Sequence, residues 1–243
     1  MNQAKVIPLE ISLHPGELCR KLGCLGWHID RDRQQAVIES LLNQALSVVA
    51  GKVVYSIHTI NKMLAGRMEL AGCPPISGPV GNHLQPASRV VVFAATLGAE
   101  FENLVRPRLA HDGRIESSIL QALADTAINA VVDAVADHLY WNELAREECL
   151  TPPLIPGCCG FDAQAVETLL SILDTRPIGL ELMPGPCLNP ALSTTGLIGI
   201  APQSKIEEFG IPCAHCDISA CRLRAEIKSP PHDPSDLPGH VIS

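Results

Sequence analysis

Residues 115–146 carry the longest helical pattern in the chain, and a helix of this length constrains everything that packs around it. Apolar side chains recur along it at intervals of three and four residues. They are Ile119, Leu123, Ala127, Ile128, Val131, Val132, Val135 and Leu139. Asp125, Asp133 and Asp137 interrupt the pattern and indicate a solvated face. We therefore expect one long helix that packs on other elements.

Other segments have the patterns of strands. Residues 89–95 form a continuous apolar run, which predicts a buried strand, and residues 52–60 are rich in β-branched side chains. Leu9, Ile11 and Leu13 alternate with polar residues and predict a short strand with Pro8 at its start, where a missing N–H is tolerated. Residues 177–183 and 197–200 also have strand patterns.

Shorter helices are predicted near residues 16–24, 37–49 and 162–173. Helices and strands mix without regular βαβ alternation, which favours an α+β fold over a doubly wound parallel sheet. Hydrophobic residues make up 47% of the chain but aromatic residues only 3%. The core must therefore be built from Leu, Ile, Val and Ala, which suits helices packed on a sheet.

Element density continues without a linker until Ser229, and four prolines follow among few apolar residues. We predict one domain over residues 1–228 and a Pro-rich tail over residues 229–243. The formal net charge of -8 argues against nucleic acid as a partner, because phosphates would be repelled. We find neither a signal-peptide apolar region nor an apolar run long enough for a membrane, so a cytoplasmic protein is expected.

Ten cysteines in a chain expected in a reducing compartment indicate metal binding or reactivity more than disulfides. Cys213, Cys216 and Cys221 have C-x2-C-x4-C spacing, which lets three thiolates converge on one centre. Cys159 lies in a Pro-Gly turn and is a candidate fourth ligand. We expect an iron–sulfur cluster, with zinc and reduced thiols without metal as the alternatives.

Several catalytic motifs are absent from the sequence: the G-x-S-x-G elbow, the Walker A loop, H-E-x-x-H and G-x-G-x-x-G. The nine histidines are scattered without metal-pair spacing. A nucleophile at Cys158 or Cys159 would need a distant histidine as its base. His58 lies within a strand pattern and is interpreted as a structural histidine.

Four segments, in order along the chain, resemble those of stand-alone proteins related to the activation domain of cobalamin-dependent methionine synthase. Residues 156–161 (Pro-Gly-Cys-Cys-Gly-Phe) are similar to that family's Pro-Gly-Tyr-Cys-Gly-Trp turn, and residues 190–196 to its Pro-x-x-Ser-Val-Ser-Gly segment. Residues 96–98 (Thr-Leu-Gly) resemble a third family segment, although they fit a turn into a helix equally well. The C-x2-C-x4-C-Arg ending is similar to that of anaerobe-type members.

This resemblance implies a central, largely antiparallel sheet flanked by helices. It also implies an accessory protein that reductively reactivates and methylates the cobalamin of a separate corrinoid protein or corrinoid methyltransferase. Whether the chain is itself an enzyme, as a corrinoid-linked methyltransferase or reductive activase, is left open. The alternative is a non-catalytic protein-interaction module that zinc stabilises.

The same resemblance assigns candidate ligand-binding residues. They are Pro156, Gly157, Cys158, Ser193, Thr194, Thr195 and Gly196. Pro153 stands where the family has arginine and Cys158 where it has tyrosine, so we expect weak or absent binding of S-adenosylmethionine. Cys159 stands where relatives keep cysteine, which favours it over Cys158 as a metal ligand.

Overall fold

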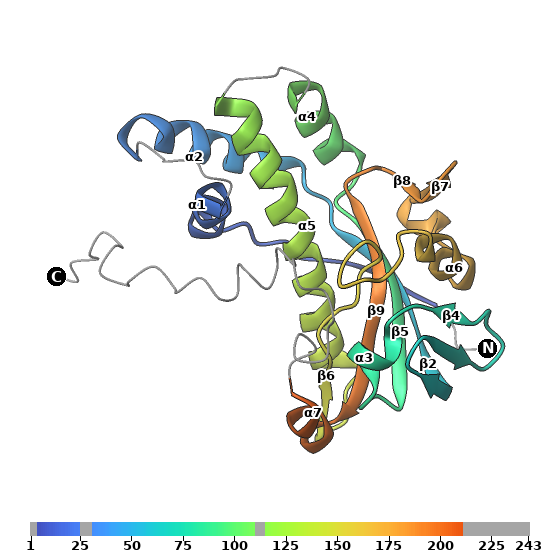
Figure 1. Ribbon diagram of the computed structural model, residues 1–243. Helices are drawn as coiled ribbons and strands as arrows, with labels where there is room; N and C mark the ends of the chain where they lie inside the picture. The colour runs from blue at the N-terminus through green and yellow to red at the C-terminus, as the bar shows by residue number, and fades with distance from the viewer. Residues whose placement is uncertain (1–3, 25–30, 110–114, 211–243) are drawn as a thin grey trace.

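The computed structural model describes residues 4–24, 31–109 and 115–210, and a seven-stranded sheet lies at its centre (Figure 1). The strands follow the order β4-β3-β2-β5-β9-β6, β1 pairs with residues 52–55 at the start of β2, and every pair is antiparallel. Their bounds are β1 Lys5–Pro8, β2 Lys52–Leu64, β3 Arg67–Leu70, β4 Ile76–Ser77, β5 Arg89–Thr96, β6 Glu148–Leu150 and β9 Ser193–Pro202. The predictions of an α+β fold and of a largely antiparallel sheet are both confirmed.

Four helices pack on one face of the sheet. They are α1 (Pro15–Cys24), α2 (Arg31–Val48), α4 (Ala99–Leu109) and α5 (Ile115–Asn142), and Figure 1 shows them together on the side away from α6. Alternate residues of the central strand, among them Val91, Phe93 and Ala95, contribute to the core under these helices. Val90, Val92 and Ala94 belong to a second core on the other face, so every residue from 90 to 95 is apolar because both faces of β5 are covered.

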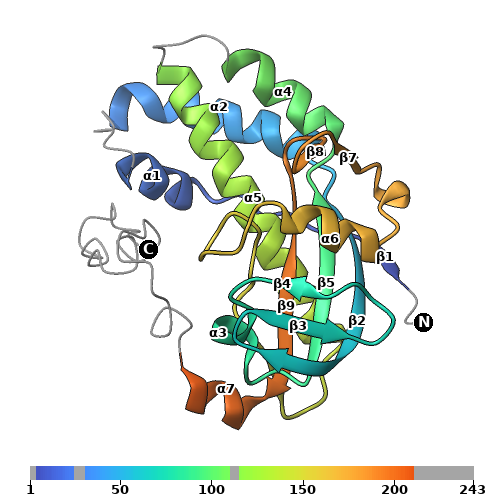
Figure 2. The same cartoon turned by 45° about the vertical axis from the view of Figure 1, so that its right-hand side comes forward.

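A smaller core lies on the opposite face of the sheet. It is covered by α3 (Val80–Leu84), α6 (Ala165–Ile172) and the strands β3 and β4, which curl over it in Figure 2. A two-stranded hairpin, β7 (Glu181–Met183) and β8 (Cys187–Asn189), precedes β9. The short 3-10 helix η1 spans Arg176–Ile178, and α7 (Gln203–Phe209) follows β9.

The predicted strand at residues 9–13 is wrong. The strand lies earlier, at Lys5–Pro8, and Pro8 ends it opposite Lys52. Burial does alternate beyond Pro8, with Leu13 buried and Glu10 exposed, but these residues have no place in the strand ladder. The alternation therefore comes from a segment outside the strand whose apolar side chains pack against the larger core, and periodicity alone does not distinguish this from a strand.

The strand predicted at residues 177–183 is wrong in its first half. Pro177 lies inside η1, which ends at Gly179 in the left-handed conformation, so only Glu181–Met183 is extended. The helix predicted from residue 162 begins at Ala165 instead. Asp162 lies in the preceding turn, where its Oδ1 accepts a hydrogen bond from the backbone N–H of Gln164 (2.9 Å).

One helix in the described part of the chain, α5, is long and apolar enough to cross a membrane by length and composition. This differs from the expectation that no run would reach that length. Helix α5 packs in the larger core, and 56% of its apolar stretch is buried there, which accounts for its composition. The predicted boundary between residues 228 and 229 lies outside the described residues.

Candidate functional site

The turn at residues 155–161 is held by its own backbone and by one buried aromatic ring. The N–H of Gly157 donates to the carbonyl of Phe161 (2.7 Å), and the N–H of Phe161 donates to the carbonyl of Cys158 (2.8 Å). The φ angle is positive at Gly157, Cys159 and Gly160. The two glycines adopt such an angle without strain, and Cys159 adopts it as a residue that is not glycine. Phe161 is fully buried in the smaller core. The turn is thus a fixed protrusion with Cys158 exposed on it.

The segment before this turn is joined to β9. Leu154 and Leu197 exchange both backbone hydrogen bonds (2.8 and 3.0 Å), an isolated antiparallel bridge outside the named strands. Gly196 permits the close approach: a Cβ there would lie 2.6 Å from Cδ1 of Ile155 and 2.9 Å from the carbonyl oxygen of Leu154. The bridge therefore brings the 156–161 turn beside the start of β9, although the two lie about forty residues apart in sequence.

A cavity of about 370 Å³ lies between these two segments. Helix α6 and the β7–β8 hairpin supply the rest of its wall. Its lining consists of Ile155, Pro156, Val166, Pro186, Cys187, Leu188, Ala191, Ser193, Thr194 and Thr195. Mostly apolar walls with a few hydroxyl groups are typical of small-molecule sites. We call this the β9 cavity.

The hydroxyl groups at the start of β9 are tied to the sheet. Ser193 Oγ donates to Thr96 Oγ1 (2.8 Å), which also accepts from the N–H of Gly98 (3.1 Å). Thr195 Oγ1 donates to the carbonyl of Phe93 (2.6 Å). Each of these donors is committed to the protein, so Ser193 and Thr195 offer a ligand their oxygen lone pairs. The Thr-Leu-Gly segment supports the cavity wall and also turns the chain into α4.

A buried carboxylate fixes the loop that leads into β9. Glu102, on the first turns of α4, is only 8% exposed and accepts a hydrogen bond from the backbone N–H of Ala191. Its other oxygen accepts from Arg106 (2.8 Å). The N–H of Leu97 donates to the carbonyl of Leu192 (3.2 Å) in the same region. Glu102 thereby positions Ala191, a wall residue of the cavity.

Four of the seven residues assigned from the resemblance line the β9 cavity together: Pro156, Ser193, Thr194 and Thr195. Gly157, Cys158 and Gly196 are not among its lining residues. Gly157 shapes the turn, Cys158 is exposed on it, and Gly196 allows the two segments to touch.

The expected metal centre falls largely outside the described residues, because Cys213, Cys216 and Cys221 lie beyond residue 210. Cys159 is half-buried against the smaller core, in the left-handed conformation (φ 53°). Within the described ranges, no three His, Cys, Asp or Glu side chains gather closely enough to hold a metal ion. The iron–sulfur and zinc hypotheses stay predictions.

Sequence reasoning missed the hairpin that completes the cavity. Pro186, Cys187 and Leu188 line it, as does Val166 of α6. The hairpin stretch has no motif of its own, and its signal is the run of turn-forming residues between the two strands, Pro184, Gly185 and Pro186.

Arg146, seven residues before Pro153, could replace the missing arginine only if the chain between them folded back to the cavity, and the structure places it far away. The strand β6 that follows it pairs with the other end of β9, Glu148 opposite Pro202. Pro202 lies seven positions along β9 from Thr195, roughly 24 Å at strand spacing. This distance exceeds the reach of an arginine side chain, so Arg146 does not serve the β9 cavity.

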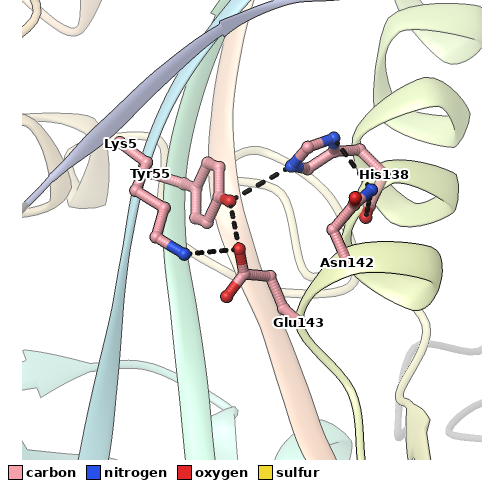
Figure 3. A network of polar contacts seen from close by, with 5 residues as sticks. All are labelled: Lys5, Tyr55, His138, Asn142 and Glu143. Atoms are coloured by element: carbon pink, nitrogen blue, oxygen red, sulfur yellow. Dashed lines mark hydrogen bonds and ion pairs between the residues drawn. The ribbon is translucent and has the colours of Figure 1, made fainter.

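A second polar cluster lies where α5 ends (Figure 3). Glu143 accepts hydrogen bonds from Lys5 Nζ (2.6 Å) and from the hydroxyl of buried Tyr55 (2.7 Å). Since Tyr55 gives its proton to Glu143, its oxygen accepts from Nε2 of His138 (3.1 Å), and the bare Nδ1 accepts from Asn142 (3.3 Å). The cluster joins β1, β2 and the end of α5.

Burial and hydrogen bonding shift the pKa values in this cluster. Burial raises the pKa of Tyr55, and its hydrogen bond to Glu143 raises it further. Burial also lowers the pKa of His138. For Glu143, burial opposes ionisation, but the hydrogen bonds from Lys5 and Tyr55 outweigh it and lower the pKa.

No family model matches the sequence, and no curated protein matches it. Among solved structures, the chain is similar to a crystal structure of the MetH reactivation domain bound to AdoHcy. The TM-score is 0.53 at 13% sequence identity, over 84% of this chain and 80% of that one. This likeness shows that the chain has the fold of that reactivation domain.

Proposed function

We propose that the chain is an accessory protein for reductive reactivation and methylation of a corrinoid protein or corrinoid methyltransferase. One observation carries the proposal. Two segments that resemble the activation-domain family, around Pro156 and from Ser193 to Thr195, meet in one cavity of a chain with the reactivation-domain fold. The AdoHcy of the solved structure supports an S-adenosyl compound as the ligand class.

The walls of the β9 cavity suit such a ligand in part. Ile155, Val166 and Leu188 offer apolar contacts to a flat ring, and the hydroxyl oxygens of Ser193 and Thr195 accept hydrogen bonds from amino or hydroxyl groups. Pro153 provides no cation for the ligand's carboxylate. We therefore propose that this protein binds S-adenosylmethionine weakly and that the corrinoid partner contributes the rest of the methyl-transfer site.

The direct test combines the full chain with a purified corrinoid protein in its Co(II) state, S-adenosylmethionine and a low-potential reductant. We expect the visible spectrum of methylcobalamin to form faster with the chain than without it. Ser193→Leu, which places an apolar side chain in the cavity, should remove the acceleration. Ser171→Leu, on the exposed side of α6, is the matched control. Equal rates with and without the chain would overturn the proposal.

We further propose that Cys159, Cys213, Cys216 and Cys221 hold an iron–sulfur cluster that supplies the electron for this reduction. The C-x2-C-x4-C spacing supports the ligand set, and zinc, the alternative, has no redox chemistry. Arg222 and Arg224 follow the last cysteine, and their charge would favour thiolates. Anaerobic purification should give brown protein with iron and sulfide. Colourless protein with stoichiometric zinc would instead support the interaction module.

A further inference from the structure

A cysteine, a histidine and a serine meet at the edge of the sheet, in a place that the proposed function does not use. Ser56 and His58 lie two residues apart on one face of β2, and Cys73 follows β3. Ser56 Oγ lies 2.7 Å from His58 Nε2, and Cys73 Sγ lies 3.6 Å from His58 Nδ1. One imidazole ring therefore bridges a hydroxyl group and a thiol.

The hydrogen bonds of this cluster permit the thiol to give its proton to the ring. If Cys73 donates to Nδ1, then Nε2 carries the proton and donates to Ser56 Oγ, so that both ring nitrogens and the thiol have a partner. In the other tautomer, the thiol donates to the carbonyl of Ala71 (3.8 Å). A nucleophile beside a base that a third group orients is the general arrangement of an activated side chain.

Two members of the cluster, Ser56 and His58, are accessible where β2 has an unpaired edge. Strand β1 pairs with β2 only through Tyr55, and β3 begins its pairing at Ile60. In this gap lies a cavity of about 360 Å³, which Ser56 and His58 line together with Lys5 and Arg89. Cys73 itself is partly exposed. A small molecule can thus approach the imidazole, and the thiol is not sealed in the core.

We propose that Cys73 is a reactive thiol that exchanges with small disulfides, with His58 as its base and Ser56 as the residue that positions His58. Cys73 Sγ forms a bond to one sulfur of the disulfide, and the disulfide bond breaks. The electron pair leaves with the second sulfur. His58 takes the proton of Cys73 and returns it to that leaving thiolate. Cys73 is oxidised to a mixed disulfide, and one thiol is released.

The alternative is that burial leaves Cys73 an unreactive thiol. Burial raises the pKa of the Cys73 thiol and lowers the pKa of His58, so the resting pair is neutral. A thiol with a raised pKa and no base should react more slowly than an exposed one. Cys187, which is exposed on β8, is therefore the comparison within the same molecule.

The experiment incubates the reduced full chain with oxidised glutathione and follows the glutathione adduct on each cysteine peptide by mass spectrometry. We expect Cys73 to be modified faster than Cys187. His58→Gln should slow Cys73 about 100-fold, the lower range for a lost general base, and should leave Cys187 unchanged. Ser56→Ala should slow Cys73 by a smaller factor, and Ser56→Thr, which keeps the hydroxyl, should restore it.

Modification of Cys73 slower than that of Cys187 in the unaltered chain would overturn the proposal, and this comparison needs no variant. An unchanged Cys73 rate in His58→Gln would overturn it as well. Circular dichroism of each variant establishes that the fold is kept. None of these outcomes depends on the corrinoid assay, so the two proposals fail separately.

Discussion

Gly196 shows how a single missing side chain creates the candidate site. Its neighbours are a branched side chain, a carbonyl oxygen and the ring of Phe93, all within 3.0 Å of where a Cβ would be. Two of the three, Ile155 and Leu154, belong to the segment that carries Pro156 to the cavity. The resemblance assigned Gly196 to ligand binding, and in the structure Gly196 allows two chain segments to pack closely.

Gly196→Ala should therefore destabilise the protein and open the β9 cavity. Overpacking of a filled core costs about 1–3 kcal/mol, and we expect a loss of unfolding free energy in that range by urea denaturation. Gly66→Ala is the control, because a Cβ at Gly66 has no neighbour within 4 Å. Equal stabilities of the two variants would show that the 154–155 segment moves away freely.

The double variant Pro153→Arg with Cys158→Tyr tests the missing carboxylate ligand. Leu154 is bridged to β9, so Pro153 and Ile155 lie on the same side of an extended segment, and Ile155 lines the cavity. An arginine there should strengthen S-adenosylmethionine binding on the order of tenfold, from one charged hydrogen bond. Isothermal titration calorimetry measures the change. Micromolar affinity of the unaltered chain would contradict our expectation of weak binding.

Among the helices, α4 holds the loop that precedes β9 in place. Glu102 belongs to this helix and bonds the backbone of Ala191 across 89 positions of sequence. The arginine it also contacts, Arg106, is largely exposed and lies one turn along the same helix. A buried acceptor has a large effect when it is removed, whereas an exposed ion pair within a helix has a small one.

Glu102→Ala should cost about 1–3 kcal/mol of unfolding free energy, since the N–H of Ala191 loses its acceptor in a partly buried loop. Arg106→Ala should cost less than about 0.5 kcal/mol. Chemical denaturation gives both values. Glu102→Ala should also weaken any ligand of the β9 cavity, which Arg106→Ala should not. A similar loss in both variants would mean that the ion pair, and not the loop contact, is what matters.

At the scale of the whole molecule, the Lys5–Tyr55–Glu143–His138 cluster links the N-terminal strand to the last turn of the longest helix (Figure 3). Glu143 has a lowered pKa in the fold. Its carboxylate therefore stabilises the protein at pH values above its ordinary pKa of 4.5. His138 and His58 also have lowered pKa values, so the folded state prefers them neutral.

Both effects have the same sign. When the pH falls below the ordinary histidine pKa of 6.5, His138 becomes protonated in the unfolded chain but stays neutral in the folded protein. The free energy of unfolding therefore decreases. Below about pH 4.5, Glu143 becomes protonated in the unfolded chain before it does in the folded protein, and the free energy of unfolding decreases further. We expect unfolding free energy, measured in urea between pH 7 and pH 4, to decline in these two steps.

Glu143→Gln should reduce the second step and keep the first, because Glu148 also has a lowered pKa, from the backbone N–H of Ala145 and from Arg89. The substitution should cost about 1–2 kcal/mol at pH 7 through the lost charge on the Lys5 and Tyr55 hydrogen bonds. His138→Asn should reduce the first step and keep the second. An unchanged profile in both variants would show that the cluster does not couple stability to pH.

Most of the helices and strands could be predicted from the sequence. The apolar run at residues 89–95, the helical pattern from residue 115 and the irregular order of helices and strands predicted the buried strand, the long helix and the α+β class. These are local properties, because burial on one or two faces imposes a period on consecutive residues. The same periodicity misplaced the first strand, because side chains at residues 9–13 alternate between buried and exposed although the segment lies outside the strand.

The two sites could not be predicted in this way, because they depend on contacts between distant segments. The β9 cavity depends on the bridge between Leu154 and Leu197 and on a hairpin without any motif. His58 looked structural in the sequence because Cys73, the thiol it faces, lies beyond a strand and a turn. Contacts of this kind are set by strand register and by how closely two backbones approach. Register joins residues by their position in space, and no pattern of neighbouring residues records it.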